Sequence, residues 1–184
     1  VENLLNMSRL ETGVIQPKMD WCDLKELIYN VLGHLKEDLQ FHKVAVEVED
    51  SLPLFKLDYG LTEQIIYNLV YNASQYTPKG AKIEVKVDYN PDVDVDYNPD
   101  KIMPCLITIS DDGNGFPEAE IDKVFDKFYR LQNSKTGGTG LGLSIVKGFV
   151  EAQNGIIELN NKEEGGSVFT IGFPALVMNT KEIS

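Results

Sequence analysis

Two asparagines one helical turn apart, Asn68 and Asn72, constrain this chain more than any other feature. A spacing of four places both side-chain amides on one face of a helix, and Gln64 and Gln75 extend that polar row. An apolar face runs beside the row through Ile65, Ile66, Leu69, Val70 and Ala73. A polar row beside an apolar face is typical of a helix that borders a polar site. Asparagines that simply face solvent are the alternative, and the helix alone does not decide between the two.

The first of two glycine clusters, Asp111-Asp-Gly113-Asn-Gly115, follows an apolar run over residues 106–109 that is typical of a buried strand. A carboxylate and two glycines therefore come together where a strand ends. Glycine tolerates positive φ and allows a ligand to approach the backbone closely. On its own, however, this cluster is more typical of a tight turn than of a site.

The second cluster, Gly137-Gly-Thr-Gly-Leu-Gly142, runs directly into a segment with helical periodicity through Leu143, Val146, Phe149 and Val150. A glycine loop that opens a helix offers free N–H groups and the positive end of the helix dipole, which suit a phosphate. No Lys-Ser/Thr pair ends the loop, so it is not a P-loop. Its alternate glycines and the polar segment before them exclude a dinucleotide-binding fingerprint.

Together, the asparagine helix, Asp-x-Gly-x-Gly, an aromatic box over residues 124–130 and Gly-x-Gly-x-Gly-Leu follow one another between residues 63 and 155. This order closely resembles the ATP-binding catalytic domain of the sensor histidine kinases. The resemblance implies an α/β (α+β) two-layer sandwich, in which one mixed sheet is covered by three helices, as in the Bergerat-type fold of GHKL ATPases. It also implies a protein-histidine kinase that uses ATP and Mg²⁺.

The same resemblance implies roles for individual residues. Asn72 would be the protein ligand to Mg²⁺, Tyr76 would pack near adenine, and Asp111 would accept a hydrogen bond from the adenine amino group. Asn68 and Arg130 are the expected catalytic residues, with Arg130 and Lys135 compensating charge on the γ-phosphate. The full expected nucleotide-binding set is Asn68, Asn72, Gln75, Tyr76, Asp111, Gly113, Gly115, Phe116, Lys127, Arg130, Gly138, Thr139, Gly140, Leu141, Gly142 and Leu143.

One position departs from the family pattern. Many members have lysine where Gln75 stands, and that lysine reaches phosphate. Lys127, Arg130 and Lys135 are the candidates to replace this contact. All three lie in or beside the expected ATP lid, a polar stretch over about residues 126–139 that has few apolar anchors and is expected to be mobile before nucleotide binds.

The resemblance also divides the chain into two parts. Residues 1–15, with a helical apolar pattern and a glycine stop at Gly13, resemble the end of the second helix of the dimerisation and phosphoacceptor domain. Residues 16–184 would form the catalytic domain. The run from Gly13 to Trp21 resembles the KdpD-type potassium sensors, which implies a function in potassium or osmotic sensing.

Neither histidine of the chain has the setting of the family's phosphoacceptor, which is His-Glu/Asp-Leu-Arg-Thr-Pro. His34 and His42 are therefore expected to be ordinary surface or packing residues, and the acceptor would lie before Val1. The resemblance implies two partners, the kinase's own dimerisation domain and a response regulator. The full-length protein would be a membrane-anchored homodimer, and this chain would be the cytoplasmic portion of a bacterial inner-membrane sensor.

Composition bears on nucleic-acid binding, membrane spans and the state of the cysteines. A net charge of −12 argues against nucleic acid as a partner, because nucleic-acid binding requires a basic face. No stretch of about 18 apolar residues is present, so no membrane span is expected. Cys22 and Cys105 lie far apart in apolar surroundings, which favours buried, reduced thiols over a disulfide.

Periodicity predicts a helix over 22–40 and strands over 44–48, 55–57, 82–87 and 103–110. Asp58 is the predicted N-cap of the asparagine helix. An acidic repeat over 88–100 mimics the start of a calcium loop. It has Tyr97 where that loop needs glycine and Met103 where it needs glutamate, so a solvated hairpin extension is expected instead.

Two other functions are weighed against kinase activity. Relatives that hydrolyse ATP carry a glutamate base one turn before the Mg²⁺ asparagine, where this chain has Asn68, and Glu63 falls on another helical face. Hydrolysis is therefore disfavoured. A catalytically silent module that binds nucleotide or a partner could retain all of these boxes, so the sequence leaves that reading open.

Overall fold

The computed structural model describes residues 2–91, 103–131 and 139–180. One layer is a mixed sheet of five strands, in which β2 and β4 are parallel and all other neighbours are antiparallel. The strands in spatial order are β2 (Lys43–Val48), β4 (Lys82–Tyr89), β5 (Cys105–Asp111), β7 (Ser167–Phe173) and β6 (Ile156–Asn161). The strands predicted from the sequence are all present, with small changes at their ends.

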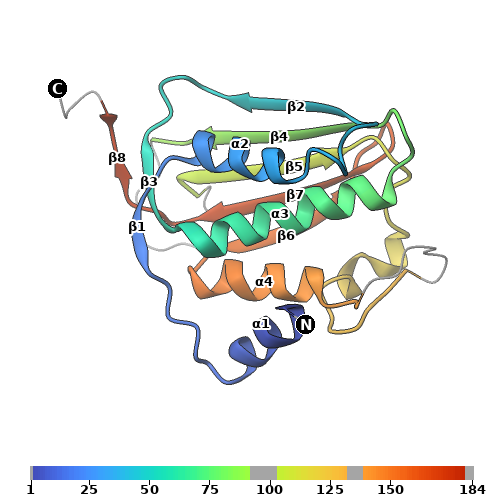
Figure 1. The fold of residues 1–184 in the computed structure, drawn as a ribbon, viewed down its shortest axis with the longest axis horizontal. Coiled ribbons are helices and arrows are strands. Elements are labelled where there is room, and N and C mark those ends of the chain that lie inside the picture. Colours follow the sequence, from blue (N-terminus) through green and yellow to red (C-terminus); the bar gives the residue numbers. More distant parts are fainter. Residues whose placement is uncertain (1, 92–102, 132–138, 181–184) are drawn as a thin grey trace.

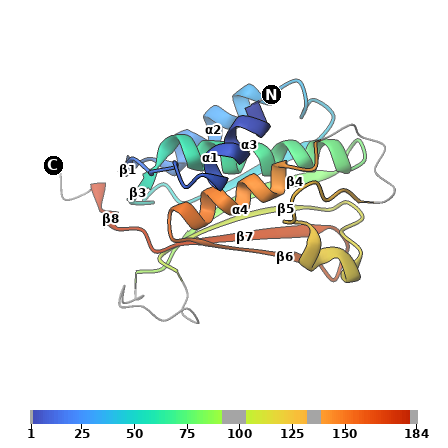
Figure 2. The ribbon, with the colours of Figure 1, turned by 90° about the horizontal axis from the view of Figure 1, so that it is seen from below.

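The second layer consists of α2 (Leu24–His34), α3 (Tyr59–Tyr76) and α4 (Gly142–Ala152), which lie across one face of this sheet (Figures 1 and 2). The apolar faces of these helices and the inward side chains of the strands form one continuous core. The predicted fold class, a two-layer sandwich with three helices on a mixed sheet, is therefore confirmed.

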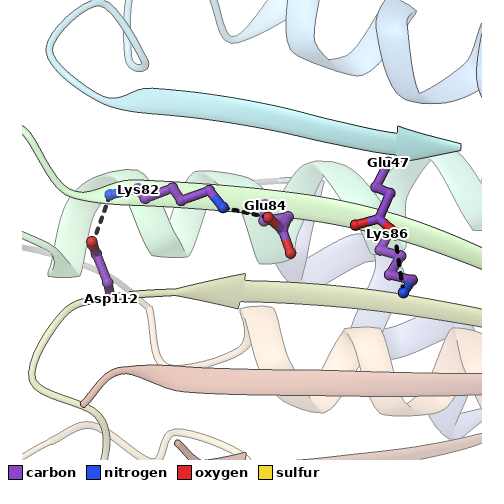
Figure 3. A network of polar contacts seen from close by, with 5 residues as sticks. All are labelled: Glu47, Lys82, Glu84, Lys86 and Asp112. Atoms are coloured by element: carbon purple, nitrogen blue, oxygen red, sulfur yellow. Dashed lines mark hydrogen bonds and ion pairs between the residues drawn. The ribbon is translucent and has the colours of Figure 1, made fainter. Parts of the chain in front are cut away.

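The alternation of β4 explains why only one face of the sheet is covered. Its inward residues are all buried: Ile83, Val85 and Val87. The intervening residues form a polar network on the opposite face (Figure 3), where Lys82 pairs with Glu84, and Lys86 lies 3.2 Å from a carboxylate oxygen of Glu47. Asp112 accepts a hydrogen bond from the backbone N–H of Lys82 at 2.6 Å. A strand with this two-residue period presents one face to the core and the other to water.

A second, smaller sheet was not predicted. It contains β1 (Met19–Cys22), β3 (Leu54–Asp58) and β8 (Val177–Met178), with β3 in the centre and both pairings antiparallel. The expectation of a single sheet was wrong in this respect. Three of the four residues of β1 are exposed, so this strand carries no alternating pattern, and its partner lies far away in the sequence.

The first predicted helix ends earlier than expected. Asp23 caps α2 by accepting from the N–H of Glu26 at 3.1 Å, but the helix stops at His34 and not at residue 40. Beyond His34 the chain continues in turns, and the N–H of Lys36 bonds to the carbonyl of Gly33 at 3.4 Å. Leu35 and Leu39 nevertheless stay buried, so the apolar spacing continues after the helix has ended.

Asp58 caps α3 as predicted, because its Oδ1 accepts from the N–H of Leu61 at 2.9 Å. Its Oδ2 also accepts from the N–H of Lys18 at 2.7 Å, in the segment before β1. The side-chain oxygen of Gln153, just after α4, accepts from the N–H of Asp58 at 2.8 Å. Three segments therefore fix the start of the helix that carries the two asparagines.

The N-terminal helix α1 (Glu2–Glu11) ends before Gly13, whose φ of 64° requires the left-handed region, as the predicted glycine stop implies. The helix lies against α4 (Figure 1), with Met7 buried. Leu10 fills the space above Gly148, where an added Cβ would come within 2.6 Å of a Leu10 methyl carbon. The division of the chain at residue 15 stays a prediction, and most of the acidic repeat, with Tyr97, lies outside the described residues.

Both cysteines are buried and free, as predicted. Burial raises the pKa of Cys22 to about 12, with further contributions from Asp23 and Glu26, and burial also raises the pKa of Cys105. Both thiols therefore stay protonated and unreactive near neutral pH. Within the described ranges, none of the helices combines the length and the apolar character that a membrane span requires.

Candidate functional site

A cavity of about 590 Å³ lies between α3, the end of β5, the aromatic box and the start of α4. Its walls contain most of the residues expected from the sequence to bind nucleotide. These are Asn68, Asn72, Tyr76, Asp111, Gly115, Phe116, Arg130, Thr139, Gly140, Gly142 and Leu143. The two glycine clusters, the aromatic box and the asparagine row thus meet around one cavity.

Four expected residues have other positions. The side-chain amide of Gln75 lies 3.3 Å from the hydroxyl of Ser74, and Gln75 does not line the cavity. Lys127 forms an ion pair with Glu11 of α1, outside the cavity.

Leu141 is fully buried beneath the start of α4, and Gly113 stands behind Asp111. Gly138 and Lys135 lie outside the described residues. Of the described candidates for the missing phosphate contact, the structure therefore brings Arg130 to the cavity wall and leaves Lys127 outside it.

Asp111 is held at the closed end of the cavity with only 9% of its surface exposed. Its Oδ1 accepts from the N–H of Gly113 at 2.9 Å, and its Oδ2 accepts from the hydroxyl of Ser167 at 2.7 Å. Each carboxylate oxygen can accept more than one hydrogen bond, so acceptor capacity remains for a ligand. Ser167 was not predicted from the sequence, because it lies on β7, 56 residues after Asp111 in the chain.

The glycines around Asp111 are required by close packing. Gly166 has a φ of 94°, and a Cβ there would overlap the carbonyl oxygen of Asp111. Gly115 has a φ of 71°, and a Cβ there would come within 2.6 Å of the Asn161 side-chain oxygen. Asn161 in turn bonds both the N–H and the carbonyl of Phe116, at 2.8 and 2.7 Å. The end of the first glycine cluster is therefore hydrogen-bonded, through Phe116, to the edge strand β6.

The start of α4 forms the opposite end of the cavity. Asp23 and Asp58 cap α2 and α3, whereas no side-chain hydrogen bond from a described residue caps α4, whose N-cap is Leu141. Free N–H groups at a helix N-terminus, together with the dipole, attract anions. An ideal Cβ on Gly142 would lie 4.0 Å from the Asn72 side-chain nitrogen, so the asparagine row faces this helix start.

A family model of the histidine kinase-, DNA gyrase B- and HSP90-like ATPases matches residues 58–177, which include all of these cavity elements. The chain belongs to this ATPase family. Sensor protein KdpD of Clostridium acetobutylicum is 34% identical over 95% of this chain and 18% of its own length. Sensor histidine kinase WalK of Bacillus subtilis is 29% identical over 95% of this chain and 28% of its own length. The chain therefore spans less than a third of the length of these two relatives.

Solved structures agree with the fold of this ATPase family. Full-length ShkA, solved in complex with AMPPNP, superposes with a TM-score of 0.79 at 21% identity, over 97% of this chain and 35% of that one. The catalytic domain of histidine kinase ThkA, in a nucleotide-free form, gives a TM-score of 0.69 at 24% identity, over 85% of this chain and 95% of that one.

The donors that line the cavity fit the Mg²⁺ ion that the resemblance implies. Among the described residues, no group of three or more His, Cys, Asp or Glu side chains could hold a metal ion by itself. Mg²⁺ suits such a site, because it keeps several waters and takes few protein oxygens beside those of phosphate. The amide oxygen of Asn72 is the donor that the cavity offers beside the start of α4.

Several further lining residues were not expected from the sequence. Tyr67 and Tyr71 stack on each other along α3, with ring centroids 6.1 Å apart. Glu120 belongs to the 3₁₀ helix η1 (Glu118–Lys123), and Tyr129 belongs to the aromatic box. The only signal for the stacked pair was its i, i+4 spacing, which any helix can carry.

Proposed function

We propose that this chain is the ATP-binding catalytic domain of a sensor histidine kinase, which donates the γ-phosphoryl group of Mg-ATP to a histidine. The observation that carries the proposal is the arrangement of Asp111, Asn72 and the uncapped start of α4 around one cavity. Membership of the ATPase family and the likeness to named sensor kinases support it.

Asp111 would recognise adenine. A buried carboxylate only accepts hydrogen bonds, so it matches the amino group of adenine and repels the carbonyl oxygen that guanine has at the same place. Ser167 and Gly113 hold the carboxylate in one orientation before any ligand arrives. The proposal therefore includes a preference for ATP and ADP over GTP.

The phosphates would lie between Asn72, Arg130 and the first turn of α4. Phosphoryl transfer depends mainly on positioning and on stabilising charge at the transferred group. In this chain Mg²⁺ would be held by Asn72 and phosphate oxygens, and it would supply neutralising charge. Asn68 lines the cavity one turn earlier and donates to the carbonyl of Gln64 at 2.9 Å, so its side-chain oxygen is directed by that bond.

The receiving histidine would come from another segment. The side chain of His34 is 69% exposed and lies 4.0 Å from Glu63. His42 bonds to the hydroxyl of Thr77 at 3.0 Å, and its buried Nδ1 has no partner among the described residues. Neither ring lines the cavity that holds Asn72 and Asp111.

Hydrolysis remains the weaker alternative. Glu63 does not line the cavity, so it is not placed to activate a water molecule there. Glu120 does line it, but its carboxylate accepts the hydroxyl of Tyr129. Asn68 cannot act as a base. The other alternative is a catalytically silent module. A measurement of turnover distinguishes the two, because a kinase transfers phosphate from ATP and a silent module does not.

The remaining functional expectations concern the whole protein. We infer that the domain acts with its own dimerisation domain and passes phosphate to a response regulator. A membrane-anchored homodimer, a cytoplasmic position for this domain and a function in potassium or osmotic sensing stay part of the proposal. The resemblance to KdpD supports the last of these, and the resemblance to WalK shows that it is not the sole possibility.

The test combines transfer with metal dependence. Incubated with labelled ATP, the chain should acquire no acid-labile phosphate, but it should label an added phosphoacceptor fragment of the same kinase. Asn72→Ala should weaken binding of Mg-ATP far more than binding of metal-free ATP. Asn160→Ala, which removes an exposed amide from β6, serves as the matched control.

Two results would contradict the proposal. Stoichiometric phosphate on His34 or His42 would overturn the division between donor and acceptor. Equal effects of Mg²⁺ chelation on wild type and Asn72→Ala would remove Asn72 as the ligand.

A further inference from the structure

Glu120 and Tyr129 line the cavity, yet the proposed function gives neither of them a role. The hydroxyl of Tyr129 donates a hydrogen bond to the Oε2 of Glu120, nine residues earlier in the chain. Both side chains are partly buried. Arg130, which follows Tyr129 directly, lines the same cavity. The bond therefore joins η1 to the residue that precedes the expected catalytic arginine.

Glu120 is mounted on a firmly held segment. Pro117 directly precedes η1. The residue before it, Phe116, hydrogen-bonds through both its N–H and its carbonyl to the side chain of Asn161 in β6. After η1, Phe125 packs edge-on against Phe169 of β7, with ring centroids 6.3 Å apart, and Phe116 does the same at 6.1 Å. η1 is thus attached to the sheet at both of its ends.

The chain from Phe125 to residue 131, in contrast to η1, has no regular secondary structure and is positioned by individual side-chain and backbone contacts. Phe128 has a φ of 62°, which is unusual for a residue with a side chain, and reverses the chain. Gly140 lies against this turn, where an added Cβ would come within 2.7 Å of the Phe128 carbonyl carbon. Lys127 is held on the outer side by Glu11, and Tyr129 is held on the cavity side by Glu120.

We propose that the Glu120–Tyr129 hydrogen bond positions Arg130 for phosphoryl transfer. Tyr129 is fixed at its backbone, where its N–H bonds to Asp126 at 3.2 Å, and at the tip of its side chain. These two attachments orient the peptide unit from which the Arg130 side chain starts. A cation that stabilises charge developing in the transition state must be in place before the reaction. Glu120 and Tyr129 are positioning residues, since they act through Arg130.

This inference rests on the proposed function and concerns the transfer step more than nucleotide affinity. The bond is neutral on the tyrosine side, so it does not need the charge of Glu120. A glutamine at this position would still offer a carbonyl oxygen to the Tyr129 hydroxyl. Glu120→Gln should therefore retain the positioning, and Glu120→Ala and Tyr129→Phe should both lose it.

The experiment measures the transfer rate to an added acceptor fragment at saturating ATP, the affinity for ATP, and amide hydrogen exchange over residues 126–131. Tyr129→Phe and Glu120→Ala should each lower the rate by about tenfold or more, because small misplacements of a reacting geometry are costly. ATP affinity should change by less than about twofold, which marks loss of a transition-state interaction. Glu120→Gln should restore most of the rate, and the double variant should be no slower than either single variant.

Tyr59→Phe is the matched control. It also removes a tyrosine hydroxyl from a hydrogen bond, with Asn30 at 3.0 Å, but at a place outside the cavity. Its rate, affinity and exchange over 126–131 should equal those of the wild type.

The inference is overturned if Tyr129→Phe transfers at the wild-type rate, if rate and affinity fall by the same factor, or if the two substitutions are additive. Unchanged exchange over 126–131 in Tyr129→Phe would also overturn it, whether or not any transfer is seen. A wild-type chain that binds no ATP would instead remove the proposed function. The exchange measurement on unliganded protein would still report whether the bond holds this segment.

Discussion

The two ends of the cavity are built in different ways. At the closed end, Asp111 is 9% exposed, and each of its oxygens already accepts a hydrogen bond from the protein. At the open end, Arg130 and Thr139 are exposed, and α4 begins without a side-chain cap from the described residues. One end is complete before a ligand binds, whereas the other offers groups that a ligand must satisfy.

This difference predicts that base recognition and phosphoryl transfer belong to separate parts of the proposed site. A rigid, buried acceptor gives base specificity, because a wrong base leaves buried polar groups unpaired. Phosphate binding at a helix start can order the segment around it, and that segment is then formed around the reacting group. Substitutions at the closed end should therefore change affinity, and substitutions at the open end should change rate.

The largest expected effect comes from Asp111→Asn. Its amide nitrogen would face either a donor of the protein or the adenine amino group, so ATP affinity should fall roughly 100-fold or more. GTP affinity should not fall in parallel, and the preference for ATP should disappear. Asp112→Asn is the control, since Asp112 accepts from Lys82 outside the cavity. Calorimetry that finds equal ATP and GTP affinity in the wild type would break the assignment of the closed end.

Arg130→Ala should have the next largest effect, and at the other end. Loss of a charge that stabilises the transition state should lower the transfer rate by roughly 100-fold, with a smaller loss of ATP affinity. Single-turnover transfer to an added acceptor, with binding measured separately, provides the two numbers. Lys123→Ala removes a nearby exposed cation that does not line the cavity. Equal losses of rate and affinity would mean that Arg130 only holds nucleotide.

A pair of adjacent glycines tests how rigid the closed end is. Gly165 and Gly166 both have positive φ, of 98° and 94°, so alanine at either position should cost about 1–2 kcal/mol of unfolding free energy from backbone strain. Only at Gly166 would the new Cβ overlap the Asp111 carbonyl. Gly166→Ala should therefore cost about 2 kcal/mol more than Gly165→Ala. Urea unfolding of both variants gives the comparison, and equal costs would show that this end yields to strain.

The smallest effect is expected for Ser167→Ala. It removes one of the two hydrogen bonds to Asp111 and leaves the carboxylate otherwise in place, which should cost about 1 kcal/mol in ATP binding. Ser110→Ala on β5 is the control, because Ser110 lies on the strand face opposite Asp111. If the transfer rate at saturating ATP fell as much as the affinity, the closed end would affect both binding and transfer, which contradicts the division between the two ends.

Much of this site followed from short stretches of sequence. The asparagine row, the cap at Asp58, the glycine stop of α1 and the helix after the second glycine cluster were all predicted, and the structure has them. Each depends on spacings of a few residues or on backbone sterics, which a sequence states directly. The family and the fold class followed from the order of these features.

Other parts depended on contacts between distant segments. Ser167 reaches Asp111 across 56 residues, and Lys127 meets Glu11 across 116. The small sheet joins β1 to β3 and β8, and α2 gives way to turns while its apolar spacing continues. Periodicity shows which face of a segment is buried but does not show what lies against it.

The sequence by itself therefore determined the ATPase family, the two-layer fold and the groups that we propose bind adenine, metal and phosphate. Only the tertiary structure decided which of those groups share a cavity: it placed Arg130 there, turned Lys127 outward to Glu11 and left Gln75 beside Ser74. The physical reason is that local conformation is set by neighbouring residues. The surroundings of a long side chain are set by whichever distant element packs beside it.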